Sequence, residues 1–241
     1  MKNKYFLAGM LLLSSSVFAS VPWEYSGESG PDSWAMLSPE YAACNGNNQS
    51  PINLTGFIEA ELTPIMFNYN AGSSEIINNG HTVQINTVAG SSISIDGIQF
   101  DLKQFHFHAP SENLIEGKSY PLEAHLVHAD TNGNLAVVAV MFTEGEASTV
   151  IENAWAQMPQ VAGENIALTS AILPLDILPE HRNYYRFNGS LTTPPCSEGV
   201  RWLVMKHPVT ASKHQIEQFA HVMHHPNNRP VQPVNARPVL K

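Results

Sequence analysis

Hydrophobic and polar residues alternate along much of the chain between positions 65 and 205, with the period of two that is typical of a half-buried β-strand. Turn signals separate several of these runs, including Asn78-Asn79-Gly80, Asp96-Gly97 and Asn132-Gly133. We expect strands at residues 65–69, 83–88, 92–95, 98–108, 122–128, 135–142 and 200–205. The pattern therefore predicts a domain dominated by a β-sheet.

Two segments instead show the helical spacing of apolar residues at i, i+3, i+4 and i+7. Thr149 and Glu152 form a candidate capping box at the start of the first segment, and Pro159 ends its pattern. Ser212 and Gln215 form the corresponding box of the second segment. The apolar stripes are Ile151, Ala154, Trp155 and Met158 in the first segment and Ile216, Phe219, Ala220 and Met223 in the second. The spacing predicts two short helices.

Residues 23–53 are rich in Gly, Pro, Ser and Asn and show no clear period. We interpret this segment as a long irregular arm that lies over the core, with Trp23 and Trp34 as its apolar anchors.

The beginning of the chain has the pattern of a secretory signal peptide. Lys2 and Lys4 precede an apolar region interrupted by serines, and Val17-Phe18-Ala19 supplies the small residues at a cleavage site. The apolar region is shorter than the roughly 20 residues that span a bilayer. We predict that residues 1–19 are removed after Ala19, and that export places residues 20–241, as a single domain, in the periplasm or outside the cell.

The charge of the chain limits its partners. The formal net charge is −9, and it becomes −11 when the two lysines of the signal peptide are removed. An acidic surface argues against nucleic acid and against an anionic membrane as partners.

Histidine and phenylalanine alternate at positions 105–108. The period of a strand places His106 and His108 on one face and Phe105 and Phe107 on the other, so that one face can pack while the other can bind a ligand. A lone His-x-His motif is a weak signal, because histidines on a half-buried strand are more often hydrogen-bonded than bound to a metal.

A second strand-like run strengthens the metal interpretation. Residues 122–128 carry Glu123 and His125 on one face, and pairing with 98–108 would bring His125 beside His106 and His108. Three neutral imidazoles leave the fourth position of tetrahedral zinc open for water, which is the arrangement of catalytic zinc. Gln104 and Glu123 each lie two residues before a proposed ligand, where they can accept the second ring N–H.

The second predicted helix carries two further histidines, His221 and His225, one turn apart. They lie off its apolar stripe. We expect both to face solvent rather than bind a metal.

The runs Gln-Phe-His-Phe-His at 104–108 and Glu-Ala-His-Leu-Val-His at 123–128 resemble the zinc-binding strands of the alpha class of carbonic anhydrases. The resemblance is to an exported bacterial member, and it covers nearly all of residues 21–241. Its other blocks are Gln49-Ser50-Pro51-Ile52-Asn53, Asn79-Gly80-His81, Leu135-Ala136-Val137-Val138, Gly189-Ser190-Leu191-Thr192-Thr193-Pro194-Pro195-Cys196 and Asn228-Arg229-Pro230.

The resemblance implies a fold of mixed α/β class dominated by β, with a central twisted, mostly antiparallel sheet, peripheral short helices and long loops. It also implies one Zn²⁺ per chain and reversible hydration of carbon dioxide to bicarbonate and a proton. In carbonic anhydrases, where this effect is best known, zinc lowers the pKa of its bound water to about 7, so the value belongs to the family and not to this sequence.

The resemblance further assigns roles to single residues. Thr192 matches the threonine that orients zinc-bound hydroxide, and Glu112 matches the carboxylate that accepts the proton of that threonine's hydroxyl. His81 matches the histidine that carries the proton out to buffer, and Asn227 lies where a carbonyl supports His108. Taken alone, Thr192 would be a turn residue, and Glu112 and His81 would be solvated loop residues.

The family's small apolar substrate pocket corresponds to Val127, Val137, Leu191, Thr193 and Trp202, which as isolated residues would simply be core. The two cysteines, Cys44 and Cys196, are expected to pair, because an exported chain passes through an oxidising compartment and because the family commonly has this bridge beside the loop that carries Thr192. The alternative is two free thiols in a reducing compartment.

The sequence departs from the best-known animal members in one region. Ala109 replaces a tryptophan after the second ligand, and the loop to Glu112 is shorter, which changes the rim of the cleft rather than the ligand set. Bacterial relatives are often dimers, so we expect a homodimer, and the other partners are the small molecules carbon dioxide and bicarbonate.

Three other interpretations remain at the level of the sequence. A cupin would use His106, His108 and Glu112 as ligands, but it would need an asparagine at position 129, where this chain has Ala129. A catalytically inactive carbonic-anhydrase-like binding protein would lack a ligand histidine. A zinc hydrolase of esters or peptides would carry His-Glu-x-x-His, which is absent.

Overall fold

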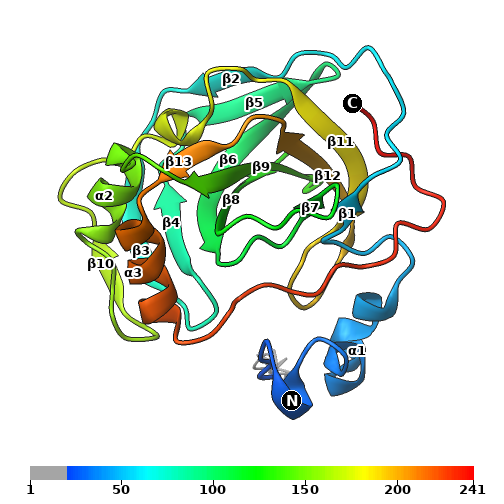
Figure 1. Cartoon of the computed structure of the whole chain (residues 1–241), viewed down its shortest axis with the longest axis horizontal. Helices are drawn as coiled ribbons and strands as arrows, with labels where there is room; N and C mark the ends of the chain where they lie inside the picture. Colours follow the sequence, from blue (N-terminus) through cyan, green and yellow to red (C-terminus); the bar gives the residue numbers. More distant parts are fainter. Residues whose placement is uncertain (1–20) are drawn as a thin grey trace, which may run out of the picture.

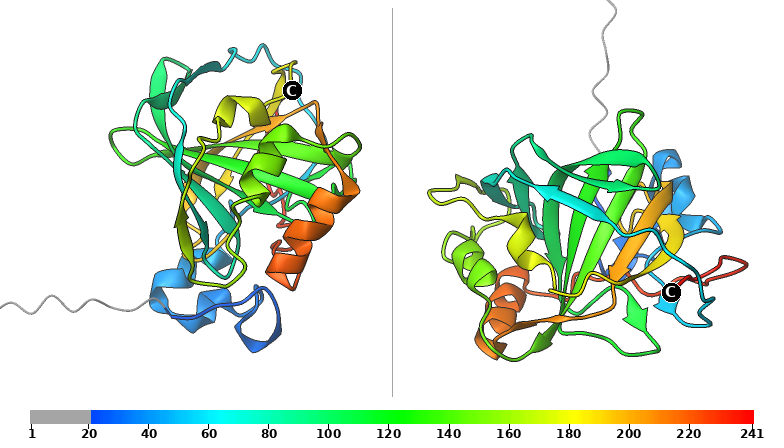
Figure 2. Two further views of the ribbon diagram at one scale, coloured as in Figure 1. Left: turned by 90° about the vertical axis from the view of Figure 1, so that its left-hand side faces the viewer. Right: turned by 90° about the horizontal axis from the view of Figure 1, so that it is seen from above.

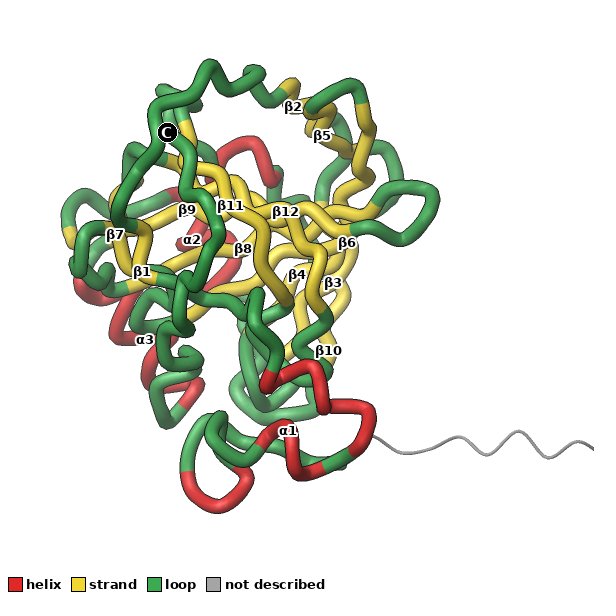
Figure 3. Tube along the Cα trace, turned by 90° about the vertical axis from the view of Figure 1, so that its right-hand side faces the viewer, coloured by secondary structure: helices red, strands yellow, loops and turns green. Residues whose placement is uncertain are grey.

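The computed structural model describes residues 21–241, and one large twisted β-sheet forms its centre (Figures 1 and 2). The strands are β1 (Asn53–Leu54), β2 (Met66–Tyr69), β3 (Ser73–Asn78), β4 (Val83–Thr87), β5 (Ser91–Ile95), β6 (Ile98–His108), β7 (Leu114–Ile115), β8 (Leu122–Ala129), β9 (Leu135–Glu144), β10 (Asn165–Ala167), β11 (Tyr184–Ser190), β12 (Glu198–Met205) and β13 (Val209–Ala211). Short helices and long loops surround the strands (Figure 3). The expected fold class is confirmed.

The large sheet has the order β10-β3-β4-β6-β8-β9-β12-β11, and β5, β2 and β13 extend it by pairing with β6, β5 and β9. Neighbouring strands in this sheet are antiparallel, except that β12 and β13 run parallel to β9. A small parallel pair, β1 with β7, lies beside it. The strands β6 and β8, which carry the histidines, lie in the middle of the sheet, where each is hydrogen-bonded to a strand on both sides.

All seven strands predicted from the alternating pattern are present, with ends that differ by at most two residues. The pattern missed β3 and β11, together with the short strands β1, β7, β10 and β13. Both longer strands contain polar residues at positions where an alternating run would have apolar ones, so periodicity alone does not reveal them.

The α-helices are α1 (Trp34–Leu37), α2 (Thr149–Trp155) and α3 (Lys213–Met223), and the 3₁₀ helices are η1 (Gly27–Ser29), η2 (Pro39–Asn45) and η3 (Pro174–Ile177). The capping box of Ser212 and Gln215 on α3 is confirmed. The prediction that Thr149 caps α2 was wrong: Ser148 is the cap, because its extended backbone lets its side chain accept from the Ile151 N–H. Within residues 21–241, no helix is long and apolar enough to cross a membrane.

The two faces of β6 and β8 pack against different layers. Phe105 and Phe107 are buried in a core completed by α2 and α3, where the Phe107 ring lies 4.9 Å from that of Trp155. The opposite face meets a second cluster, which contains Val137 and Trp202. Burial of each large apolar side chain stabilises the fold by about 1.5–3 kcal/mol. Because the sheet packs against a core on both faces, the histidines project from a rigid support.

The N-terminal segment is the irregular arm that the composition predicted, and it lies below one end of the sheet in Figure 1. Trp34 is fully buried and its indole N–H donates to the Glu24 and Ser29 carbonyls at 3.0 and 3.1 Å. Trp23 is half-buried and packs edge-on against Trp34, with 5.1 Å between ring centroids. A disulfide between Cys44 and Cys196 ties the arm to the loop after β11.

Removal of the disulfide in a Cys44→Ala/Cys196→Ala variant should lower the free energy of unfolding by about 2–5 kcal/mol, because the bridge joins residues 152 positions apart and restricts the unfolded chain. Urea unfolding of the variant and of the wild type, each with and without reductant, measures this. Reductant should destabilise only the wild type, and an equal midpoint for both proteins under oxidising conditions would contradict the prediction.

A buried histidine outside the site makes stability depend on pH. His128 is fully buried, its Nδ1 donates to the Ala136 carbonyl at 3.2 Å, and its Nε2 accepts from the Tyr69 hydroxyl at 2.7 Å. Both ring nitrogens are therefore satisfied in the neutral form, without a charge in the core. Burial lowers the pKa of His128 to about 4, against an ordinary value near 6.5.

As the pH falls from about 6.5 to about 4, the unfolded chain takes up a proton at this residue that the folded chain does not, which should cost about 3 kcal/mol of stability. The contribution is fully present above pH 6.5. Urea unfolding of wild type and His128→Gln at several pH values isolates it, and the variant should lose less stability over this range. Parallel pH dependences would show that His128 does not titrate in this way.

Candidate active site

Three imidazoles meet on one face of the sheet because of the register between β6 and β8. His106 lies directly opposite His125 in this antiparallel pair, and the period of two places His108 on the same face. One ring nitrogen from each of the three lies within 4.8 Å of the others. The predicted ligand set is therefore brought together by strand pairing alone.

The second nitrogen of each imidazole ring lies beside an oxygen atom of the protein. His106 Nδ1 donates to Gln104 Oε1 at 2.8 Å, and His108 Nδ1 donates to the Asn227 carbonyl at 2.6 Å. His125 Nε2 lies 3.0 Å from Glu123 Oε1, although the angle of this contact does not make a hydrogen bond. Because these oxygens can accept hydrogen bonds but cannot donate them, the tautomers that they favour leave lone pairs on His106 Nε2, His108 Nε2 and His125 Nδ1, which face the same point.

The protonation of this cluster suits a cation. Burial lowers the pKa of all three histidines, most strongly those of His106 and His125, so the rings are neutral near pH 7. His108 Nε2 is buried and has no hydrogen-bond partner among the described residues. Three neutral imidazole donors with supported tautomers are the donor set of catalytic zinc, and the residues present fit that ion.

Glu123 is itself held in place. One of its oxygens accepts from the main-chain N–H groups of Glu112 and Asn113, at 2.7 and 2.9 Å, and the other accepts from the Asn113 side chain at 2.8 Å. Burial raises the pKa of Glu123, and the Asn113 hydrogen bonds lower it. This carboxylate fixes the ring of His125 and also anchors the turn that carries Glu112.

Glu112 lies beside the imidazoles. Its Oε1 accepts from the Arg229 main-chain N–H at 2.9 Å, and its Oε2 lies 3.5 Å from His108 Nε2 and has no hydrogen-bond partner by distance and angle. Burial raises the pKa of Glu112 to about 8, while the Arg229 N–H and the neighbouring Thr192 hydroxyl lower it. A divalent cation on the three imidazoles would lower this pKa further, because it favours the charged carboxylate.

Apolar side chains border the imidazoles. Val137 and Trp202 are buried, and Val127 and Leu191 pack against the same cluster. The Trp202 ring lies 4.9 Å from that of His125, and its indole N–H donates to the Ser190 carbonyl at 3.0 Å. Thr193 is half-buried in the adjoining loop, where its carbonyl accepts from the Cys196 N–H at 2.8 Å.

Known proteins share this arrangement. A model of the eukaryotic-type carbonic anhydrase family matches residues 29–241. The carbonic anhydrase of Pectobacterium atrosepticum is 49% identical over 243 residues, and the match covers the whole of both chains. The chain belongs to the alpha-class carbonic anhydrases.

Solved structures agree with this assignment. The alpha-carbonic anhydrase of Thermovibrio ammonificans, solved with the inhibitor sulfanilamide, is 49% identical with a TM-score of 0.91, over 92% of this chain and 100% of that one. The alpha-carbonic anhydrase of Photobacterium profundum is 49% identical with a TM-score of 0.87, over 91% and 100%. The activity is therefore the reversible hydration of carbon dioxide, with zinc at His106, His108 and His125.

Membership of this family resolves two of the three interpretations that the sequence left open. The cupin and hydrolase interpretations were wrong, since the family and fold are those of a carbonic anhydrase. Glu112, which a cupin would use as a ligand, lies outside the group of three residues whose nitrogens converge.

Arg229 is a further component of the site, and in the sequence it is recognisable only as part of a motif shared with the family. Its guanidinium is buried and donates to Gln49 Oε1, the Ser50 carbonyl and the Cys44 carbonyl at 2.8, 2.8 and 2.9 Å. Burial lowers the pKa of Arg229 to about 10, so it stays charged at neutral pH. Because its main-chain N–H holds Glu112, this arginine couples the arm to the catalytic face. The signal available was a basic residue two positions after Asn227, in the block Asn228-Arg229-Pro230 shared with the family.

His81 lies at the turn between β3 and β4, away from the sheet. Its ring stacks on that of Trp23, with 3.8 Å between centroids and 11° between planes. Asn227 connects His81 to the ligands. Its side chain donates to the His81 carbonyl at 3.0 Å, and its main-chain carbonyl accepts from His108 Nδ1. His81 thus belongs to the structure around the metal ligands without contacting them.

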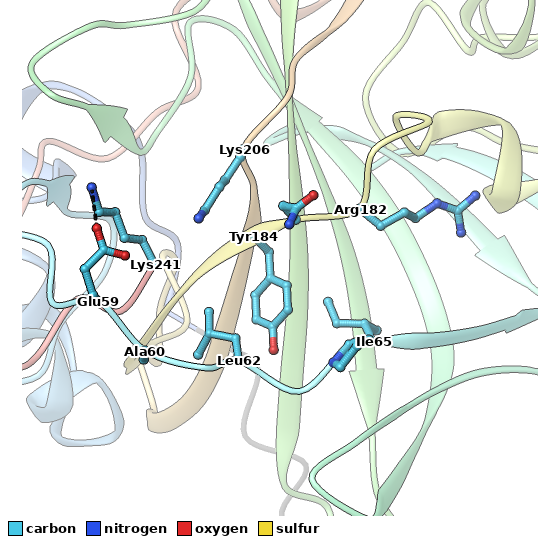
Figure 4. Close-up of a pocket in the computed structure, with 10 residues that line it drawn as sticks. Glu59, Ala60, Leu62, Ile65, Arg182, Tyr184, Lys206 and Lys241 are labelled. Carbon is cyan, nitrogen blue, oxygen red and sulfur yellow. Dashed lines mark ion pairs between the residues drawn. The ribbon is translucent and has the colours of Figure 1, made fainter.

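A separate hollow of about 430 Å³ shares no lining residue with this site (Figure 4). Lys241 there pairs with Glu59 at 3.1 Å, while Lys206 and Arg182 extend in opposite directions from Tyr184. The positive groups do not converge on one point, and we assign no chemistry to this hollow. Its lining residues are Glu59, Ala60, Leu62, Pro64, Ile65, Arg182, Asn183, Tyr184, Lys206 and Lys241.

Proposed function

We propose that Thr192 and Glu112 orient the attacking oxygen during hydration of carbon dioxide and that His81 carries the released proton to buffer. The observation that carries this proposal is the position of Glu112, a buried carboxylate whose unpaired oxygen lies 3.5 Å from His108 Nε2 and whose pKa the Thr192 hydroxyl lowers. Zinc, when bound by the three imidazoles, supplies a Lewis acid that lowers the pKa of a coordinated water.

The direction of the Thr192 hydrogen bond follows from the chemistry of its partner. An ionised carboxylate can accept a hydrogen bond but cannot donate one. If Glu112 is ionised, the Thr192 hydroxyl points its proton at Glu112 and turns a lone pair toward the cluster. That lone pair can accept a hydrogen bond from the O–H of the attacking oxygen, which fixes the rotation of that oxygen.

The substrate pocket is assigned to Val127, Val137, Leu191, Thr193 and Trp202. Carbon dioxide is small and carries no net charge, so apolar walls beside His125 favour it over water. The Cys44–Cys196 bridge and the hydrogen bonds of Arg229 support the loop and the arm around this pocket.

Stopped-flow hydration of carbon dioxide with a pH indicator tests the function directly. The chain from residue 20 onward should hydrate carbon dioxide rapidly, lose activity on chelation and regain it with one zinc per chain. A folded, zinc-loaded protein that does not hydrate carbon dioxide would contradict the proposal and would point to a binding role for the site.

Replacement of His81 by alanine should lower kcat in dilute buffer by roughly 10-fold or more, since general acid–base groups contribute about 10²–10⁴-fold when no alternative acceptor exists. The value of kcat/KM should stay within about twofold, because proton export follows bicarbonate release. Imidazole buffer should restore part of kcat. If His81→Ala keeps the wild-type kcat in dilute buffer, His81 is not the shuttle.

The remaining assignments are also proposals. Residues 1–19 lie outside the described part of the chain, so mass spectrometry of the exported protein is needed to test cleavage after Ala19. A periplasmic or secreted location is supported by the disulfide, since such bridges persist in oxidising compartments. A single catalytic domain over 20–241 is supported by the one continuous sheet, and analytical ultracentrifugation tests the homodimer.

A further inference from the structure

A second histidine lies near His81, at the end of α3. The ring of His225 is 6.1 Å from that of Tyr25, and the ring of Tyr25 is 6.3 Å from that of His81. Burial lowers the pKa of His81, the Glu24 charge raises it, and the His225 charge lowers it again. The two imidazoles are therefore close enough to influence each other's charge, although they come from segments more than 140 residues apart.

The tautomer of His225 is set by its own surroundings. His225 Nδ1 lies 3.0 Å from the Pro226 carbonyl, which can only accept a hydrogen bond, so Nδ1 carries the proton in the neutral ring. His225 Nε2 is then the basic nitrogen. The side chain is half-buried, so this nitrogen lies at the boundary between the protein and the solvent.

We propose that His225 is a second proton acceptor beside Tyr25, working in parallel with His81. The proposal rests on the proposed function, because it needs a proton to leave the cleft in each turnover. Hydration converts carbon dioxide and water to bicarbonate and one proton. That proton adds to Nε2 of neutral His225, and a buffer base in solvent then removes it, which restores the neutral ring.

The groups around the two histidines fit this role. Burial, and next the Glu112 charge, raise the pKa of Tyr25 well above its ordinary value, so this tyrosine stays protonated and does not compete for the proton. Glu24 favours a charged imidazole at His81, while a charge on His225 disfavours it.

The test compares His225→Gln in two backgrounds, wild type and His81→Ala. Glutamine is close to histidine in size and is polar, so the chain before Asn227 should keep its path, but glutamine does not titrate. The matched control is His221→Gln, because His221 is exposed on α3 and its nearest aromatic ring partner is His224, at 5.9 Å, rather than Tyr25.

In dilute buffer, His225→Gln alone should lower kcat by about twofold, and in the His81→Ala background it should lower kcat by roughly 10-fold more. The value of kcat/KM and the zinc content should not change, and concentrated imidazole should restore kcat. A merely structural role would lower kcat/KM or zinc content as well.

Equal kcat for His81→Ala and His81→Ala/His225→Gln in dilute buffer would overturn the inference while leaving the proposed function intact. An equal loss in His221→Gln would overturn it too, because the effect would then belong to any histidine of the helix. A zinc-loaded wild type that does not hydrate carbon dioxide would overturn both.

Discussion

Replacement of His125 by alanine should remove zinc from the protein and lower the rate of carbon dioxide hydration by about 10⁴-fold or more. Without the cation, the pKa of the attacking water rises from about 7 back toward its much higher value in bulk water, so hydroxide is scarce at neutral pH. Two of the three donor nitrogens would remain, which is too few for the tetrahedral site. Stopped-flow hydration together with metal analysis of the dialysed protein measures both effects.

Two comparisons make this result specific. His207→Ala removes an exposed histidine that follows β12 and should keep full zinc and full activity. Gln104→Ala removes the acceptor of His106 but no ligand, and should weaken zinc binding by about 10- to 100-fold without abolishing it. A His125→Ala protein that kept one tightly bound zinc and rapid hydration would show that the metal is held elsewhere.

The ligand face could be predicted from the sequence because it depends on local geometry. A period of two decides that His106 and His108 share a face whatever the rest of the chain does. That His125 joins them was expected from pairing of the two strands, and the antiparallel direction and the register that place His106 opposite His125 come from the structure. Gln104 and Glu123 followed from the same rule, and both lie against the rings that they were expected to support.

The cap of α2 shows the limit of such local reasoning. Ser148 and Thr149 are both good caps, and the spacing of the following residues does not choose between them. The choice depends on which residue has the extended backbone, and this is decided by contacts with Gln215, whose side chain binds Ser148 on both its N–H and its carbonyl. That contact joins residues 67 positions apart.

Arg229 could not be assigned for the same reason. Its guanidinium partners come from the arm at separations of 179 to 185 residues, and Trp34 stacks against it at 5.3 Å. No pattern in the neighbourhood of Arg229 signals a buried charge. The family resemblance supplied Thr192, Glu112 and His81 as candidates, but only the three-dimensional arrangement shows how the arm, the arginine and the carboxylate are connected.

Glu112→Gln should lower kcat/KM by about 10²- to 10³-fold while zinc content stays at one per chain. The Arg229 N–H donates to Glu112 Oε1 at 2.9 Å, so the amide oxygen of the glutamine would take that position. Its NH₂ group would then face Thr192. The Thr192 hydroxyl could no longer donate in that direction, and its proton would turn toward the attacking oxygen instead of its lone pair.

Removal of the hydroxyl in Thr192→Ala should have a similar effect, whereas Thr192→Ser keeps the hydroxyl and should retain most of the activity. Because Thr192 and Glu112 act through one hydrogen bond, the double variant Thr192→Ala/Glu112→Gln should be little slower than either single variant. Stopped-flow kinetics on the four zinc-loaded proteins measures the coupling. Multiplicative losses in the double variant, or wild-type kcat/KM in Glu112→Gln, would mean that the carboxylate does not orient the threonine and serves only to hold the Arg229 segment in place.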